Sequence, residues 1–344
     1  SAIILTGLSY KIEKIYLNFG LNSLKKIIKY SLDNQGFSKS RNIKQQIFYL
    51  KYFILIREWF KESQNQIPEH IDETIFYLGQ AYAFIWQNIN TDLLFNGNTN
   101  SDNSEFDNYL KKLGYKFKND NYDYGGYIIL KDKNTFLTMD VGSTPGTKYT
   151  KDYQSGALSF EIFFKNCKLI SNCGYFQNYK HQLNPISKST ATHSTLVLDN
   201  RSSCKMKKDT DGIFKVDEEL KILKKSVISE KKHWNITGSH DGYLKKYGVI
   251  HERNIQFFVE KNRFIGKDKL IKKRNFKSSN FEIRFHFQPG TKISKTQDEK
   301  SVLIELENSG WKFSCEDYKI DVESGLYFGK KNSFVENQNI FISG

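Results

Sequence analysis

Cysteine and proline are scarce in this chain of 344 residues, which holds only four of each. Four scattered cysteines exclude a disulfide scaffold for a domain of this size, and none lies in a CxxC zinc pattern, so we expect them to be small buried hydrophobic residues. No segment reaches the roughly 18 consecutive apolar residues of a membrane span. Dinucleotide, nucleotide-phosphate, HExxH and GxSxG signatures are also missing from the sequence, which excludes the common enzymes that carry them.

Positive charge and aromatic residues are abundant instead. The net charge is +14, the pI is about 9.3 and aromatic residues make up 15% of the chain. This charge favours a polyanionic partner, either an acidic polysaccharide or a nucleic acid, although AT-rich codon usage also produces a lysine excess. The sequence shows no reading helix and no RNP-like strand, so we expect no nucleic-acid binding. The aromatic content is typical of β-rich and carbohydrate-handling proteins.

The first quarter of the chain has apolar residues at helical spacing. They predict helical segments over residues 11–32, with a break at Gly20, and from a cap at Ser40 or Asn42 to about residue 63. Pro68 begins a third helix, which extends to about residue 88. Such antiparallel hairpins need a partner to cover their second apolar face.

After an Asn-, Gly- and Ser-rich boundary the hydrophobic period changes to two. Short alternating strands separated by turn residues predict an antiparallel sandwich rather than βαβ units. We therefore predict a helical domain over 1–95, a linker over 96–124 and a β-sandwich over 125–344. Lysine-rich segments at 205–232 and 267–277 are interpreted as solvated edges and loops, with a polyanion groove as the alternative.

A hairpin is the clearest local motif. GALSFEIFF predicts a strand, Lys165 and Asn166 form a two-residue turn, and Gly174 lets the chain turn away after the second strand. We predict that His193 enters a third strand among Thr192, Ser194 and Thr195. One imidazole would then lie at a sheet edge among small hydroxyl side chains.

These segments resemble a known family. LSFE, LISNCG and HSTL in this order, followed by SHDGY and RFHFQPG, are similar to the C-terminal domain of the heparinase II/III-like polysaccharide lyases. The resemblance implies an α+β protein, with N-terminal helical hairpins from a truncated α/α toroid followed by a large antiparallel β-sandwich. The chain opens without Met, and we interpret it as a piece whose front is missing. The resemblance implies a periplasmic or cell-envelope location.

Lyases of this kind cleave uronate polysaccharides by β-elimination, which needs a group that neutralises the carboxylate, a base and an acid. By resemblance, His193 is the first catalytic candidate. His240, beside Asp241, is the second, and Arg41 could bind a carboxylate with two hydrogen bonds. The implied partner is an acidic polysaccharide, and the oligomeric state is not predicted.

The sequence departs from the family pattern at the expected metal site. Asp152 and Gln154 occupy the positions of a His-x-His pair before LSFE, and Asn172 occupies that of an aspartate. A site assembled from Gln154, Asn172 and His193 would be a poor zinc site, because one strong nitrogen ligand and no carboxylate remain. We predict substrate contacts for Asp152, Gln154, Asn172 and Tyr153. Zinc, or another divalent metal, is implied only by the resemblance.

Two functions follow. The first is a polysaccharide lyase that acts on an acidic glycan. The second is a non-catalytic glycan-binding or envelope-structural protein that kept the sandwich and lost the base. The substitutions at Asp152, Gln154 and Asn172 favour the second function, whereas His193 and the SHDGY loop favour the first.

Overall fold

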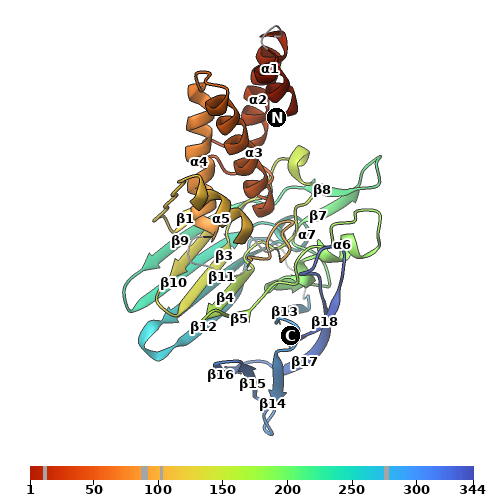
Figure 1. Ribbon diagram of the computed structural model, residues 1–344. Coiled ribbons are helices and arrows are strands. Elements are labelled where there is room, and N and C mark those ends of the chain that lie inside the picture. Colours follow the sequence, from red (N-terminus) through yellow and green to blue (C-terminus); the bar gives the residue numbers. More distant parts are fainter. Residues whose placement is uncertain (11–13, 87–91, 101–103, 275–278) are drawn as a thin grey trace. The chain divides into compact units, whose positions relative to one another are not determined.

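The computed structural model describes residues 1–10, 14–86, 92–100, 104–274 and 279–344 (Figure 1). The chain divides into two compact units. Unit 1 comprises Ser1–Asn90 and Ser101–Gly125, and unit 2 comprises Thr91–Asn100 and Gly126–Gly344. The boundaries predicted at residues 95 and 124 stay a prediction.

Unit 1 is helical. Its elements are α1 (Ala2–Ser9), α2 (Lys14–Ser31), α3 (Ile43–Glu62), α4 (Glu69–Trp86), α5 (Ser104–Lys112) and the short strand β1 (Asp123–Tyr124). The Asn42 side chain accepts a hydrogen bond from the Gln45 backbone N–H at 3.3 Å, so the predicted cap of α3 is confirmed. Glu69 and Asp72 lie in the first turn of α4, where acidic side chains stabilise the helix dipole.

The predicted helix break at Gly20 is wrong. Helix α2 runs through this residue without interruption. A Cβ atom at Gly20 would lie only 2.6 Å from the Ile4 side chain, so the glycine is needed where α1 packs closely against α2. Glycine serves close packing here rather than a turn.

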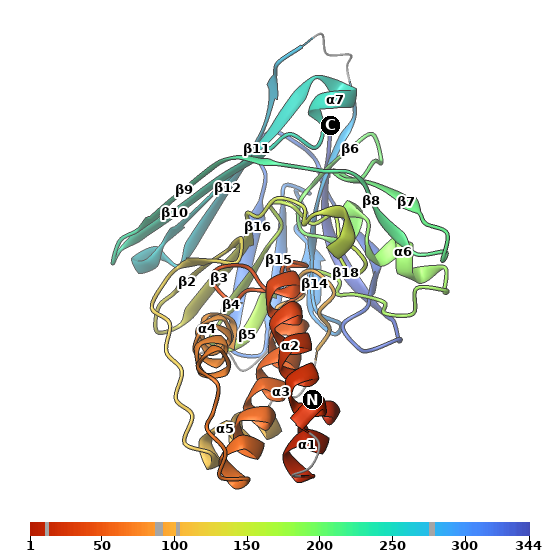
Figure 2. The same ribbon diagram turned by 90° about the horizontal axis from the view of Figure 1, so that it is seen from above.

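Unit 2 is built from antiparallel sheets (Figures 1 and 2). One sheet has the order β2 (Tyr127–Lys131), β3 (Thr135–Asp140), β4 (Phe160–Phe164), β5 (Cys167–Ile170). A second has the order β12 (Arg263–Lys272), β11 (Val249–Phe258), β10 (His233–His240), β9 (Ile222–Ser229). A third has the order β17 (Ile320–Tyr327), β18 (Val335–Ser343), β13 (Phe281–His286), β6 (Leu196–Leu198).

Smaller elements complete unit 2. They are the sheet β14 (Lys292–Lys295), β15 (Ser301–Leu306), β16 (Ser309–Ser314), the pair β7 (Lys205–Lys208) and β8 (Phe214–Glu218), and the helices α6 (Leu183–Ser187) and α7 (Leu244–Tyr247). Three single turns of 3₁₀ helix are η1 (Thr147–Tyr149), η2 (Thr190–Thr192) and η3 (Val259–Lys261).

The main core of unit 2 lies between these sheets. Inward side chains of β2–β5 pack with those of β10, β11, β15, β17 and β18, and Trp234, Ile236 and Phe257 are among the most buried. Alternation along β10 places Trp234 and Ile236 inward and Asn235 and Thr237 outward. The predicted α+β class, helical hairpins followed by an antiparallel sandwich, is confirmed. None of the helices within the described residues is both long and apolar enough to cross a bilayer.

Two local predictions need correction. His193 does not enter a strand: it follows η2 with extended backbone, and β6 begins only at Leu196. The lysine-rich segments are mostly strands rather than loops, because 205–232 contains β7, β8 and β9, and 267–272 belongs to β12. The prediction of solvated edges is confirmed, since β9 and β12 are the largely exposed edge strands of their sheet. The predicted hairpin turn is confirmed, since Lys165 and Asn166 both have positive φ between β4 and β5.

Candidate functional site

His193 lies in a tight, polar part of unit 2. Its ring is 1% exposed, and its Nδ1 lies 2.8 Å from the Ser189 carbonyl oxygen, which can only accept. The Nδ1 atom therefore carries the proton, and Nε2 is a buried acceptor without a partner among the described residues. Burial lowers the pKa of His193 to about 4, although the Ser189 carbonyl opposes the shift. The ring is neutral at neutral pH.

Gly156, in the GALSFE motif, makes room for this imidazole. A Cβ atom at position 156 would lie 2.5 Å from Cδ2 of His193. The motif glycine therefore allows the backbone to approach the ring, and any larger residue would displace it.

Gln154 and Asn172 act as structural amides beside His193. The Gln154 side chain donates to the carbonyls of Gly174 (2.9 Å) and Ser187 (2.6 Å), and its oxygen accepts from Gly97 N–H (3.0 Å). The Asn172 oxygen accepts from Ser194 N–H at 2.9 Å, whereas its Nδ2 has no partner among the described residues. Both residues are fully buried, and their hydrogen bonds join four chain segments, around residues 97, 154, 172–174 and 187–194.

These three side chains do not fit zinc. The Gln154 oxygen is already engaged with a backbone N–H, the Asn172 oxygen is engaged with another, and His193 offers a single nitrogen. Within the described ranges, no group of three His, Cys, Asp or Glu side chains could hold a metal ion. A tetrahedral zinc site requires more nitrogen, sulfur or carboxylate ligands than this set provides.

The purified protein is therefore expected to bind no zinc at this site. Adding a chelator should leave the thermal unfolding midpoint unchanged, because hydrogen bonds rather than a metal ion hold Gln154, Asn172 and His193 in place. Metal analysis by mass spectrometry and a melting curve with and without chelator check this. A stoichiometric metal whose removal lowers the midpoint would contradict it.

His240 belongs to a buried chain of hydrogen bonds rather than to an exposed loop. Its Nδ1 accepts from Gly242 N–H at 3.1 Å, so its proton lies on Nε2, which is 3.2 Å from Nδ1 of His251. His251 then carries its proton on Nε2 and donates it to Asp268 at 2.6 Å. One backbone N–H thus fixes both tautomers. Burial lowers the pKa of both imidazoles.

Asp268 connects this chain to Arg253. The guanidinium donates to both carboxylate oxygens, at 2.8 and 2.9 Å. Burial raises the pKa of Asp268, but Arg253 and His251 outweigh that effect and the net pKa is lowered. Arg253 also donates to the carbonyls of Leu158 (3.1 Å) and Ser194 (2.6 Å). This chain of hydrogen bonds therefore ends at the Ser194 carbonyl, next to His193, and holds that segment in place.

Asp152 is partly accessible to solvent. Its half-buried carboxylate accepts from the Tyr175 hydroxyl at 3.2 Å, and Asn184 donates to the same hydroxyl at 3.1 Å. Burial, followed by the charge of Asp152, raises the pKa of Tyr175, which keeps its proton. The exposed Lys151 ammonium lies 5.1 Å from the ring centre of the half-exposed Tyr179. We call Lys151, Asp152, Tyr175, Tyr179 and Asn184 the Asp152 cluster.

Lys188 holds the backbone of the Asp152 cluster through a hydrogen bond to Lys151. Its side chain is completely buried, and Nζ donates to the carbonyls of Lys151 and Phe214. Burial lowers the pKa of Lys188 to about 8, and the nearby Asp152 charge opposes this shift. The ammonium thus fixes the backbone immediately before Asp152.

The remaining predicted site residues are buried. Tyr153 is 1% exposed and packs with Cys204 and Val216. Arg41 belongs to unit 1, where it precedes the α3 cap with a positive φ of 57° and its Nε donates to the Gly125 carbonyl. Among the aromatic residues near the motifs, Tyr175 and Trp234 are also buried, whereas Tyr179 is partly accessible.

Sequence reasoning missed Lys151, Lys188 and Asn184. The adjacent charges of Lys151 and Asp152 just before the GALSFE motif were a signal for Lys151. Nothing local pointed to Asn184 or Lys188, because each acts through contacts with residues far away in the sequence.

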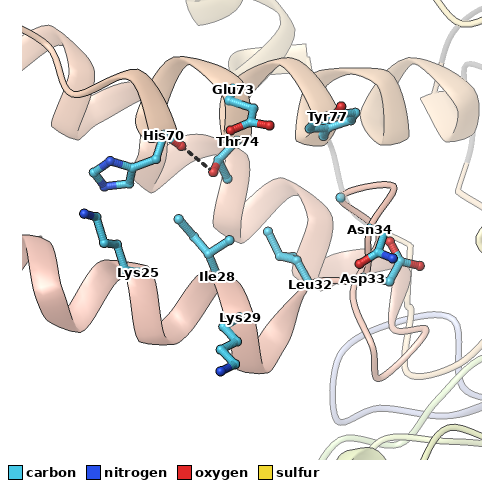
Figure 3. Close-up of a pocket in the computed structure, with 11 residues that line it drawn as sticks. Lys25, Ile28, Lys29, Leu32, Asp33, Asn34, His70, Glu73, Thr74 and Tyr77 are labelled. Atoms are coloured by element: carbon cyan, nitrogen blue, oxygen red, sulfur yellow. Dashed lines mark hydrogen bonds between the residues drawn. The ribbon is translucent and has the colours of Figure 1, made fainter.

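Unit 1 has a groove of about 310 Å³ between α2 and α4 (Figure 3). Lys25 and Lys29 project from α2, whereas His70, Glu73 and Thr74 project from α4. Burial, followed by Lys25, lowers the pKa of His70. The groove is lined by side chains of both charge signs.

Comparisons with known proteins agree with this architecture. Structurally, the chain is similar to the heparan sulfate lyase HepC from Pedobacter heparinus, with a TM-score of 0.76 and 15% identity, covering 99% of this chain and 56% of that one. It is similar to heparinase III, the BT4657 gene product, with a TM-score of 0.78, 15% identity, and coverage of 99% and 56%. A further heparinase III structure has a TM-score of 0.74 and 14% identity, with coverage of 99% and 57%.

The chain thus spans a little more than half the length of these solved lyases. At such low identity the likeness establishes the fold alone. No curated protein matches the sequence. Residues 117–344, however, match the family described as heparinase II/III-like, C-terminal. Because this match covers most of the chain, the protein belongs to the heparinase II/III-like family.

Proposed function

We propose that this chain is part of a polysaccharide lyase that cleaves an acidic, uronate-containing glycan by β-elimination. The observation that carries the proposal is the Tyr175–Asp152 hydrogen bond, which holds a partly accessible carboxylate next in the sequence to the exposed Lys151. By the family resemblance, Asp152 occupies one of the two positions of the His-x-His pair before LSFE. A periplasmic or cell-envelope location, where such glycans occur, is part of the same proposal.

The Asp152 cluster can supply the elements of the reaction. Lys151 pairs with the uronate carboxylate, which makes the C5 proton more acidic. Asp152 removes that proton, the C4–O bond breaks, and a C4=C5 double bond forms. The proton taken by Asp152 then passes to the leaving glycosidic oxygen on the same face of the sugar. Tyr175 and Asn184 hold the carboxylate in place, and Tyr179 offers a ring surface to a sugar.

His193, His240, Gln154 and Asn172 are proposed to support this site rather than to contact the reacting atoms. Their burial and their hydrogen bonds to backbone groups favour a role in holding the loops that surround the Asp152 cluster. Arg41 and Tyr153 remain predicted contacts of the carboxylate and of the sugar.

Replacing Asp152 tests the proposal. Asp152→Asn should lower kcat by about 100-fold or more, because an amide cannot accept the C5 proton. Full-length protein would be screened on heparan sulfate, alginate, hyaluronan and bacterial exopolysaccharides, with the near-ultraviolet absorbance of the unsaturated uronate as readout. Asp211→Asn, on the exposed β7–β8 turn, is the matched control and should retain activity. Equal activity of the two variants would exclude Asp152 as the base.

A second candidate is glycan binding without cleavage. The burial of His193 and His240 and the fully engaged amide of Gln154 favour it, because both imidazoles are kept away from a dissolved substrate. Binding of a uronate polymer with no rise in absorbance would support this second function.

A further inference from the structure

The outward side of the sheet β12-β11-β10-β9 carries three amide side chains, Asn235, Asn254 and Gln256. The four strands of this sheet are labelled in Figure 2. Their register aligns cross-strand rows of side chains on the outward side. One row is Ile265, Gln256, Asn235 and Ile228, and the next is Lys267, Asn254, Thr237 and Ser226. The rows on either side are Arg263, Phe258 and His233, and Lys269, Glu252, Ser239 and Lys224. We call this the amide face.

The amide side chains are joined to one another across the strands. Asn254 donates to Asn235 and, at 2.7 Å, to Thr237, and Gln256 donates to Asn254 at 3.1 Å. This leaves Nδ2 of Asn235 and Oε1 of Gln256 without a hydrogen-bonding partner in the described part of the chain, although neither is sealed from solvent. The three amide side chains are thus held in place by one another, and together they still offer a hydrogen-bond donor and an acceptor to a ligand.

Apolar side chains flank these amides, and positively charged side chains lie at the edge of the face. Ile265 and Ile228 are 37% and 45% exposed at its two ends. Phe258 and His233 stack with ring centres 4.8 Å apart in the adjacent row. Lys224 pairs with Glu252 at 3.2 Å, whereas Lys267 and Lys269 are exposed and make no ion pair with a described residue. With Arg263, the rim is positive.

We propose that the amide face is a binding surface for an extended acidic polysaccharide, separate from the Asp152 cluster. The amides match sugar hydroxyls, the Phe258–His233 pair and the two isoleucines match the apolar faces of sugar rings, and the free lysines match carboxylate or sulfate groups. Rows repeat about every 7 Å along the strands, so four rows extend over about 20 Å, which suits a chain of several sugars. A nucleic acid fits less well, because the centre of the face is uncharged.

Binding in an Asp152→Asn background tests the inference independently of catalysis. Calorimetric titration with alginate and heparan sulfate oligosaccharides should show about 10-fold weaker binding for Lys267→Glu/Lys269→Glu, a loss of about 1.4 kcal/mol. Asn254→Ala/Gln256→Ala should weaken binding while leaving its salt dependence unchanged. The control Lys292→Glu/Lys312→Glu makes the same charge change on β14 and β16 and should bind normally.

Several results would overturn the inference. Equal losses in the control and in Lys267→Glu/Lys269→Glu would show an effect of net charge alone. Undiminished binding by both amide-face variants would place the glycan elsewhere, and tighter binding of single-stranded DNA than of either glycan would identify the wrong polyanion. Failure of the absorbance assay with intact amide-face binding would reject the lyase proposal and leave this surface standing.

Discussion

The sandwich of unit 2 is expected to unfold in mild acid, between about pH 5.5 and pH 4, because it encloses four neutral histidines. His193, His240, His251 and His286 are each at most 2% exposed. Burial lowers the pKa of His193 to about 4 and that of His286 to about 3, and it lowers the pKa of His240 and His251 as well.

Because the pKa values of these histidines are lowered in the folded state, the free energy of unfolding falls as the pH falls. Unfolded histidine has a pKa near 6.5, so the unfolded chain binds protons below that pH while the folded chain does not. Each imidazole then removes up to about 1.4 kcal/mol of stability per pH unit, and four remove about 5 kcal/mol per unit. Asp268, whose net pKa is lowered by Arg253 and His251, loses its stabilising contribution below about pH 4, in the same direction.

Urea denaturation at a series of pH values, followed by tryptophan fluorescence, measures this slope. His193→Asn keeps a donor near the Ser189 carbonyl but removes the titrating group, so the slope between pH 5 and 6 should fall by about one quarter. His181→Gln, at an exposed position, is the control and should leave the slope unchanged. A wild-type stability that does not change between pH 7 and pH 5 would contradict the expectation.

Local chemistry explains why the hairpin of β4 and β5 could be predicted from the sequence. Lys165 and Asn166 adopt the positive φ values of a two-residue turn, and the flanking apolar alternation fixes the faces. The cap at Asn42 is equally local. Such features depend on residues within a few positions of one another, which a single sequence displays.

The lysine-rich strands could not be predicted in this way. On β12, Lys267 and Lys269 point outward while Asp268 between them is buried against Arg253. The partner of Asp268, Arg253, is on the neighbouring strand and far away in the sequence. The local pattern of an aspartate between two lysines therefore predicts a solvated loop. Long-range pairing overrides the local pattern in this strand.

The candidate site contains features that the local sequence predicts and features that depend on long-range contacts. The family motifs located Asp152, Gln154, Asn172 and His193, and the structure gathers Gln154, Asn172 and His193 around shared backbone segments. The hydrogen bonds that define their roles reach residues far away in sequence, such as Tyr175 for Asp152 and Gly97 for Gln154. Residue types were therefore predictable, whereas burial and partners were not.

The ion pair between Glu161 and Lys168 should be the most sensitive single contact of the core. The two side chains are 0% and 1% exposed, with Oε2 and Nζ 3.1 Å apart. Glu161 also accepts from the N–H groups of Asn172 (2.8 Å) and Leu94 (3.1 Å). Burial raises the pKa of Glu161 and lowers that of Lys168, and each partner opposes the shift of the other.

Lys168→Met is therefore expected to lower the free energy of unfolding by about 3–5 kcal/mol, because it leaves Glu161 buried without a counter-charge. Glu161→Gln/Lys168→Met should recover much of that loss, since the glutamine oxygen can still accept from Asn172 and no lone charge remains. Lys232→Met, which breaks an exposed pair with Glu260, should have no resolvable effect. Urea denaturation at neutral pH distinguishes the three variants. If Lys168→Met is as stable as Lys232→Met, then Glu161 is held by its backbone donors alone, and the ion pair contributes nothing to the stability of the core.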